Sequence, residues 1–420
     1  MKESFLHYLW KFKLFIPGRL KTTDGKEVEI INSGTHNTNA GPDFFNAKVK
    51  IGDTTWAGNV EIHIKSSDFF LHKHQHDKSY ENLILHVVFE NDVPAINNYF
   101  TLQVKDSFDR KLLQNYNSLQ NSTKKLACSG TVASVPNVIF KSWLDGMFFE
   151  RMESKAFAIE EKLSQNTNNL DEVFYFQLAA NFGFKINQEP FELLARKLPF
   201  SILAKHRNNL FQLESLLLGV AGFLGNEFEE SYPRELQNEF RFLQKKFSLS
   251  TMDVSNWKFL RMRPGNFPTL RIAQFAALIN KSGNVFSSFL NATSAKEIEK
   301  VLDIEPSSYW NNHYRLDVPS DNKKKRLGKK SKENIIINSV IPFLFIGGKN
   351  QGKDELLNRA NKLVNELKPE ENNITKLFSS AGKKPENAAE SQAMINLYKN
   401  FCSAKRCDNC AAGNYLLKNL

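Results

Sequence analysis

The residues best suited to chemistry lie near the start of the chain, where six of its nine histidines fall between His36 and His86. Glu61 and His63 are two residues apart in an alternating run, so their side chains project from the same face of a strand. A short polar segment follows and supplies His72, His74, His76 and Asp77. Imidazole nitrogens and carboxylate oxygens together suit Zn²⁺, Mn²⁺ or Fe²⁺. The cluster therefore predicts a metal site; the alternative is a solvated loop with His86 in the core.

Asp43 and Glu61 form a second candidate site, because a hairpin would bring them together. Asp43 begins one alternating run and Glu61 lies near the end of the next. Two carboxylates that face one cleft would hold Mg²⁺ or Mn²⁺, which polarises a phosphate and activates water. His63 or Lys65 would then orient the water or stabilise the developing charge. The alternative is that Asp43 caps a turn and Glu61 lies on the surface.

The four cysteines are a third candidate site: Cys402, Cys407 and Cys410 lie within nine residues, and Cys128 is far upstream. Four cysteines are too few for the disulfide framework of a secreted protein of this length. Thiolates so close together would repel one another unless they were protonated or bound to a metal. Zn²⁺ or an iron–sulfur cluster would compensate their charge, with Cys128 as the fourth ligand. The alternative is a set of four reduced thiols.

The chain is basic, with a net charge of +11 at pH 7 and a pI near 9.2. This balance suits a polyanion such as nucleic acid or an anionic membrane surface, although lysines also simply maintain solubility. Two basic stretches are candidates for phosphate contacts, and they contain Arg261, Arg263, Arg271, Lys324, Lys325 and Arg326. The alternatives are pairing of the arginines with helix acids and a solvated lysine loop.

Hydrophobic periodicity places these residues on an α+β fold. Apolar residues at helical spacing predict a helix at 3–16, which a Pro-Gly pair ends. Strands are predicted at 27–31, 82–90 and 98–106, and a β-hairpin at 44–65. The 82–90 segment is continuously apolar, which is typical of a central strand that is buried on both faces. From Pro136 onward the pattern is helical almost throughout.

We therefore expect two domains in the chain. The first, at 1–125, contains a mixed β-sheet and the candidate metal ligands, and the second, at 126–420, is a large all-α domain that ends in the cysteine-rich tail. No apolar run is as long as a membrane span, and the amphipathic start differs from a secretory signal. We expect a cytoplasmic protein without a membrane partner. The sequence leaves the oligomeric state open.

The spacing around Asp43 and Glu61 resembles the PD-(D/E)XK nuclease motif. Pro42-Asp43 opens the predicted hairpin, and Glu61-Ile62-His63 lies in its second strand. His63 stands where that superfamily has lysine, and Lys65 on the same strand face could replace it. The resemblance implies a restriction-endonuclease-like N-terminal domain that cleaves nucleic acid with a divalent metal. The one-plus-three cysteine arrangement is similar to that of iron–sulfur nucleases of bacterial recombination and CRISPR adaptation, although the tail spacing differs.

Several strings along the chain together resemble an uncharacterised bacterial family, domain of unknown function 2851. They include NTNAGPDFFNAKVKI, WAGNVEIHIKSSDF, PFELLARKLP, LAKHRNNLFQLESLLLG, WKFLRMRPGNFPTLRIAQFAALI and the C-terminal CxxxxCxxCAAGN. The resemblance covers nearly the whole chain. It implies a cytoplasmic single-chain protein and no established activity.

Our first functional hypothesis is a divalent-metal-dependent, nuclease-like protein that acts on nucleic acid, because acidic, histidine, basic and thiol features coincide in this sequence. The first alternative is a non-catalytic nucleic-acid-binding protein with a structural zinc or iron–sulfur site. The second alternative is a metal-dependent hydrolase of a small molecule, for which the basic charge is incidental.

Overall fold

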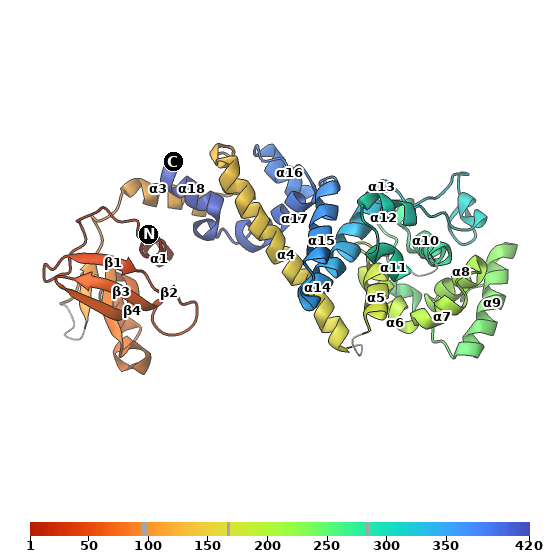
Figure 1. The fold of residues 1–420 in the computed structure, drawn as a ribbon, viewed down its shortest axis with the longest axis horizontal. Helices are drawn as coiled ribbons and strands as arrows, with labels where there is room; N and C mark the ends of the chain where they lie inside the picture. The colour runs from red at the N-terminus through yellow and green to blue at the C-terminus, as the bar shows by residue number, and fades with distance from the viewer. Residues whose placement is uncertain (95–98, 166–168, 283–284) are drawn as a thin grey trace. The chain divides into compact units, whose positions relative to one another are not determined.

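A computed structural model of the chain describes residues 1–94, 99–165, 169–282 and 285–420 (Figure 1). Its contacts divide the chain into two compact units. The first, here called the sheet unit, comprises Met1–Trp143, Leu377–Lys383 and Leu397–Leu420. The second, here called the helical unit, comprises Leu144–Lys376 and Lys384–Asn396. The sheet unit is therefore complete only when the end of the chain returns to its beginning.

A six-stranded mixed sheet forms the centre of the sheet unit. Its strands are β1 (Val28–Asn32), β2 (Thr35–His36), β3 (Phe44–Ile51), β4 (Thr54–Lys65), β5 (Leu83–Glu90) and β6 (Phe100–Gln103). They follow the order β1-β3-β4-β5-β6, with β2 paired to β3. Strands β3 and β4 form the predicted hairpin, and Gly52 in its tight turn has the left-handed backbone (φ 58°) that glycine tolerates best.

Strand β5 runs parallel to both of its neighbours, β4 and β6. Strands in parallel pairing are usually covered on both faces, and the first six residues of β5 are all buried, as its continuous apolar run predicted. The register places Glu61 of β4 opposite His86 of β5. Glu61 and His63, which project from the same face of β4, are consequently buried beside His86.

The complete helices of the sheet unit are α1 (Glu3–Lys11), α2 (Asp68–Leu71), α3 (Arg110–Gln120) and α18 (Ala411–Asn419). Helix α1 packs on β4 and buries Phe5, Leu9 and Trp10 in the core of the sheet. Helix α18 lies beside α3 (Figure 1), where the side-chain amide of Asn115 donates to the Leu417 carbonyl at 3.1 Å. Leu417 also joins the core that contains α1, so the two ends of the chain share one hydrophobic core.

The helical unit has a core rich in aromatic residues. The helices that lie entirely within this unit are α5 (Leu170–Phe182), α6 (Gln188–Lys197), α7 (Phe200–Lys205), α8 (Leu210–Val220), α9 (Ser231–Phe247), α10 (Pro268–Lys281), α11 (Val285–Leu290), α12 (Ala295–Val301), α13 (Lys329–Ile335), α14 (Ile341–Gln351) and α15 (Asp354–Glu366). Helices α4 (Asn137–Gln165), α16 (Asn373–Ser380) and α17 (Ala388–Leu397) contribute residues to both units. Strands β7 (His313–Arg315) and β8 (Val318–Pro319) form a small second sheet. Glu214 is fully buried here, and Tyr232, Ser307 and Trp310 donate hydrogen bonds to its carboxyl group.

The α+β class predicted from the sequence is confirmed, with the mixed sheet first and the helices after it. The compact units differ from the predicted division at residue 125, because residues 126–143 and the tail pack with the sheet. The first helix ends at Lys11 rather than at 16, since Lys13 adopts a left-handed backbone (φ 51°). Strand β6 is shorter than the predicted 98–106, and residue 98 lies outside the described residues. In the part of the chain that the structure describes, no helix has both the length and the apolar character needed to cross a membrane.

A close glycine contact holds β4 against the start of β5. A Cβ atom at Gly58 would lie 2.5 Å from Cγ2 of Ile84 and 2.7 Å from the Asn82 carbonyl oxygen. We expect Gly58→Ala to destabilise the sheet unit by about 1–3 kcal/mol, because the added methyl group overpacks this contact. Denaturant unfolding followed by circular dichroism measures the change.

The matched control is Gly146→Ala in α4, an exposed helical position where an added Cβ meets nothing within 4 Å. Helix propensity predicts that this substitution stabilises the protein by about 1 kcal/mol. If both substitutions changed the free energy of unfolding in the same direction, the claim that Gly58 is needed for close packing of β4 against β5 would be wrong.

Candidate metal centre

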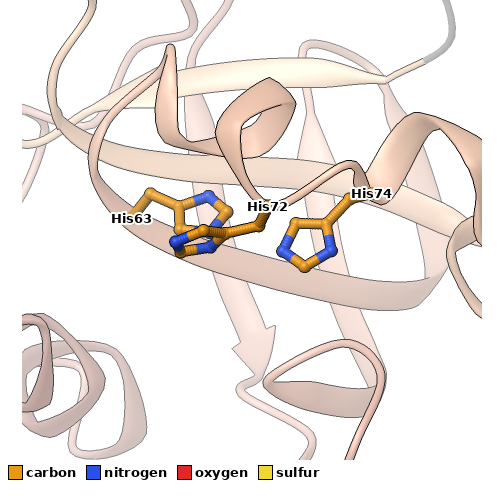
Figure 2. Close-up of side chains that lie close together, drawn as sticks. All are labelled: His63, His72 and His74. Atoms are coloured by element: carbon orange, nitrogen blue, oxygen red, sulfur yellow. The ribbon is translucent and has the colours of Figure 1, made fainter.

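Three histidines converge beside β4 (Figure 2). His63 belongs to β4, whereas His72 follows α2 and His74 begins the 3₁₀ turn η1 (His74–His76). One ring nitrogen of each histidine lies within 4.8 Å of those of the other two, and Figure 2 shows the three imidazoles close together. His63 is buried, His74 is half-buried and His72 is exposed, so the group opens to solvent on the His72 side.

Glu61 adds a buried carboxyl group to these histidines. The residue is only 4% exposed, and its Oε1 lies 3.4 Å from Nε2 of His63 and 3.2 Å from Nε2 of His74. Ligands about 2.0–2.1 Å from a tetrahedral metal ion would be about 3.3 Å from one another, which is close to both distances. Burial, and next the carboxylate of Asp43, raise the pKa of Glu61 to about 9. A cation at this point would offset the cost of the buried negative charge.

His86 of β5 orients His63. Its Nε2 lies 2.9 Å from Nδ1 of His63, so one ring donates a hydrogen bond to the other. Burial lowers the pKa of His63 to about 2 and that of His86 to about 4, and both rings are therefore neutral at pH 7. When His63 donates from Nδ1, the lone pair on its Nε2 faces Glu61. This tautomer would leave Nε2 free to bind a metal, with His86 as the partner that holds the ring in place.

Asp43, which directly precedes β3, forms two hydrogen bonds with β4 at Glu61 and Ile62. Its Oδ2 accepts a hydrogen bond from the backbone N–H of Ile62 at 2.9 Å, and its own N–H donates to Glu61 Oε2 at 3.1 Å. His7 of α1 contacts the same carboxylate, with Nε2 at 3.3 Å from Asp43 Oδ2. The structure thus brings the two predicted carboxyl groups together, and the alternative of a surface Glu61 is wrong.

Sequence reasoning missed two residues of this centre, His7 and Tyr80. The Tyr80 hydroxyl lies 3.5 Å from both Glu61 Oε1 and His74 Nε2, and its ring stacks on His74 with a centroid distance of 4.2 Å. The available signal for His7 was its position one helical turn after Glu3, whose Oε1 lies 3.9 Å from His7 Nε2. Nothing in the sequence separates Tyr80 from the other buried tyrosines.

Three candidate residues lie outside the centre. Lys65 shares the strand face of the site but is exposed, as is His76. Asp77 is also exposed, and its carboxylate caps the turn η2 (Lys78–Tyr80) by accepting from the Ser79 N–H at 2.9 Å. The donor set is consequently richer in nitrogen than the predicted pair of carboxylates. Such a set favours Zn²⁺, Mn²⁺ or Fe²⁺ over Mg²⁺.

Two of the predicted phosphate-binding residues are interior residues of the helical unit. Arg271 is 4% exposed, and its guanidinium donates to Gln274 at 2.9 Å and to Ser331 at 3.0 Å. Lys325 is 5% exposed, and its Nζ donates to the Asn311 carbonyl at 2.7 Å. Both side chains serve the fold, because the two terminal nitrogens of the Arg271 guanidinium and the Nζ of Lys325 already have acceptors within the protein.

The other four predicted basic residues lie nearer the surface. Lys324 and Arg326 both pair with Glu305, at 3.2 Å in each case. Arg261 and Arg263 are exposed. Four of the six predicted phosphate-binding residues therefore have partners within the protein. Arg261 and Arg263 are the two that are most accessible to a ligand.

All four cysteines belong to the sheet unit and are free thiols. Cys410 is buried, and Cys128 and Cys407 pack against the core of the sheet. The cysteines do not belong to the histidine group. The group of ligand atoms that lie within 4.8 Å of one another consists of the three imidazole nitrogens only, among the described residues.

Comparison with known proteins identifies one family. The family described as Protein of unknown function (DUF2851) matches residues 3–373, which include all the acidic and histidine residues of the centre. No curated protein and no solved structure matches the chain. The three tail cysteines lie beyond the matched residues.

We expect the chelator-treated full chain to bind one Mn²⁺ at this centre, since carboxylate and imidazole ligands accept Mn²⁺ whereas thiolates select softer metals. His74→Ala removes a ligand and should weaken binding at least about tenfold. His76→Ala, in the same segment but exposed, is the matched control and should bind as the wild type does. Isothermal titration calorimetry measures the affinity. Equal affinities for the two variants would exclude His74 as a ligand.

A second prediction concerns the raised pKa of Glu61. The folded-state pKa is about 9 and the ordinary value is 4.5. Between these values the unfolded chain releases the proton first, so the carboxyl group costs the folded state an increasing free energy as pH rises. In metal-free protein, Glu61→Gln should therefore be more stable than the wild type near pH 8, and the difference should shrink toward pH 5. The slope is at most about 1.4 kcal/mol per pH unit.

Saturating Mn²⁺ should reverse this order, because only the wild type offers an ionised carboxylate ligand. Thermal unfolding at several pH values, with and without Mn²⁺, measures both effects. A stability difference that does not vary with pH would show that Glu61 titrates normally.

Proposed function

The chain belongs to the family described as Protein of unknown function (DUF2851), and we propose that it is a divalent-metal-dependent nuclease that cleaves phosphodiester bonds in nucleic acid. The observation that carries the proposal is the convergence of Glu61, His63, His72 and His74 beside Asp43. A metal held by such a group polarises a phosphate and lowers the pKa of a bound water, which then attacks at neutral pH.

In this proposal Glu61 Oε1 and the Nε2 atoms of His63 and His74 hold the metal on its protein side. Their mutual distances of 3.4 and 3.2 Å support this role. His72 lies at the exposed edge of the group, where substrate would enter. Catalytic metal sites keep at least one position open in this way, whereas structural sites are closed by protein ligands.

His7 and Asp43 are proposed to accept the proton from the attacking water. The His7 Nε2 atom lies 3.3 Å from Asp43 Oδ2, within ion-pair distance once the ring is protonated, and this leaves Nδ1 to take the proton. A carboxylate behind a histidine orients the ring and stabilises its protonated form. His7 takes the role that the sequence suggested for His63 or Lys65, because His63 is buried among the ligands and Lys65 is exposed.

Two observations support nucleic acid as the substrate. The hairpin that carries Asp43 and Glu61-Ile62-His63 resembles the PD-(D/E)XK motif, and a sheet in which this hairpin continues into a parallel strand is compatible with a restriction-endonuclease-like fold. The net charge of +11 favours a polyanion, for which Arg261 and Arg263 are accessible contacts.

A metal-dependent hydrolase of a small molecule is the second candidate. The burial of Arg271 and Lys325 favours it, because these cations are then unavailable to a nucleic-acid backbone. This enzyme would use the same metal centre. It would differ from the first candidate in having no affinity for polyanions.

Cleavage of plasmid DNA, single-stranded DNA and RNA by the full chain with Mn²⁺ tests the proposal. The wild type should cut at least one of them. Glu61→Gln should abolish cleavage by removing an ionised ligand, and His7→Ala should lower the rate about 100-fold by removing the proton acceptor. His76→Ala is the control for the histidine substitution and should cut at the wild-type rate.

Equal cleavage by the wild type and Glu61→Gln would reveal a contaminating nuclease and reject the proposal. If Mn²⁺ binds but no nucleic acid is cut, the same variants should be assayed with bis-p-nitrophenyl phosphate. Hydrolysis of this small diester that depends on Glu61 would support the second candidate.

A further inference from the structure

Four thiols from two distant parts of the chain belong to the sheet unit. Cys128 follows α3, Cys402 ends the helical turn η8 (Tyr398–Cys402), and Cys407 begins the turn η9 (Cys407–Asn409). Cys410 follows η9 directly and is 8% exposed. All four are free thiols, so no disulfide accounts for their gathering.

The four sulfur atoms are near enough to influence one another's charge. Burial, and next Cys410, raise the pKa of Cys128 to about 12, and burial, Cys128 and Cys410 together raise that of Cys407 to about 12. Burial also raises the pKa of Cys402, and the other three thiols add to this effect. A bound metal would offset both the burial cost and the mutual repulsion of their ionised forms.

Backbone contacts hold the tail cysteines in position. The N–H of Cys410 donates to the Cys407 carbonyl at 3.3 Å, and the N–H of Asn414 donates to the Cys410 carbonyl at 2.7 Å. The Asn414 side chain also donates to the Asp408 carbonyl at 2.7 Å. A Cβ at Gly413 would lie only 2.0 Å from the Cys407 carbonyl oxygen, so α18 can approach this closely only with glycine there.

Hydrogen-bond donors surround the sulfur of Cys410. Burial raises the pKa of this thiol, whereas the backbone N–H groups of Gly413 and Ala412 and the indole N–H of Trp143 lower it. The Trp143 Nε1 atom is buried, and within the described ranges its contact with this sulfur falls short of a hydrogen bond. A buried donor without an acceptor is costly, and an ionised sulfur at this site would supply the acceptor.

The spacing of the sulfurs favours a cluster over a single ion. A lone Zn²⁺ with Zn–S bonds of about 2.3 Å requires sulfurs about 3.8 Å apart. Among the described residues, three histidine nitrogens come within 4.8 Å of one another, and no three of the cysteine sulfurs do so. We propose that Cys128, Cys402, Cys407 and Cys410 hold an iron–sulfur cluster, whose several irons keep the thiolate ligands farther apart than one ion would.

This cluster would fasten the C-terminal tail to the sheet unit. The tail is otherwise held there by packing and by polar contacts, such as the pair that Gln120 and Lys405 form through each other's backbone carbonyls. The cluster is independent of the proposed hydrolytic centre, because the two sites share no residue.

Anaerobic purification of the full chain tests the proposal. The protein should be brown and should contain iron and acid-labile sulfide in equal amounts, after reconstitution with ferrous iron and sulfide where needed. Cys128→Ser and Cys410→Ser should each lose most of the iron. Ser403→Ala, an exposed position in the same loop, should retain it.

The wild-type protein provides a measurement that does not depend on the folding of any variant. Lys399 and Arg406 are exposed, and removal of iron with a chelator in air should loosen the backbone around them so that trypsin cleaves there faster. Reconstitution should restore both the visible absorbance and the resistance to cleavage. One zinc per chain without iron would overturn the proposal. So would a reconstituted protein that retains no iron after gel filtration. Neither readout depends on nuclease activity.

Discussion

Glu61 is buried in the sheet unit with Oε2 on the Asp43 amide and Oε1 among the histidines. A buried ionised carboxylate is costly unless a positive charge compensates it, and burial lowers the pKa of His63 and His74, the two rings nearest to Glu61 Oε1. Because its pKa is about 9, the carboxyl group keeps its proton at pH 7, and a bound cation would let it ionise. The surrounding structure keeps the carboxyl group buried: β4 pairs with the parallel strand β5, and His86 on β5 shares a hydrogen bond with His63.

The sequence predicted the parts of this centre that depend on local periodicity. Alternation predicted the hairpin of β3 and β4, and with it the shared face of Glu61 and His63. The separation of His74, which is a ligand candidate, from His76 and Asp77 could not be predicted, because it depends on how η1 turns against β4. Periodicity carries no information about such a tertiary contact.

The contributions of distant residues were beyond sequence reasoning for the same reason. His7 reaches Asp43 only because α1 packs on β4, and the interior positions of Arg271 and Lys325 follow from the packing of the helical unit. Composition gives the number of cations in a chain, but it does not give the number that solvent or a ligand can reach. The cysteine arrangement required the whole chain, since its members are separated by more than 270 residues, from Cys128 to Cys402.

The return of the tail to the first residues has a consequence for the order of events during protein synthesis. Residues 144–376 make up most of the helical unit and leave the ribosome before 397–420, which complete the sheet unit. The nascent chain must therefore carry an unfinished β-rich segment, with part of its apolar surface uncovered, throughout most of translation. A premature stop codon near the end would leave the helical unit nearly whole and the first-made segment without its last layer.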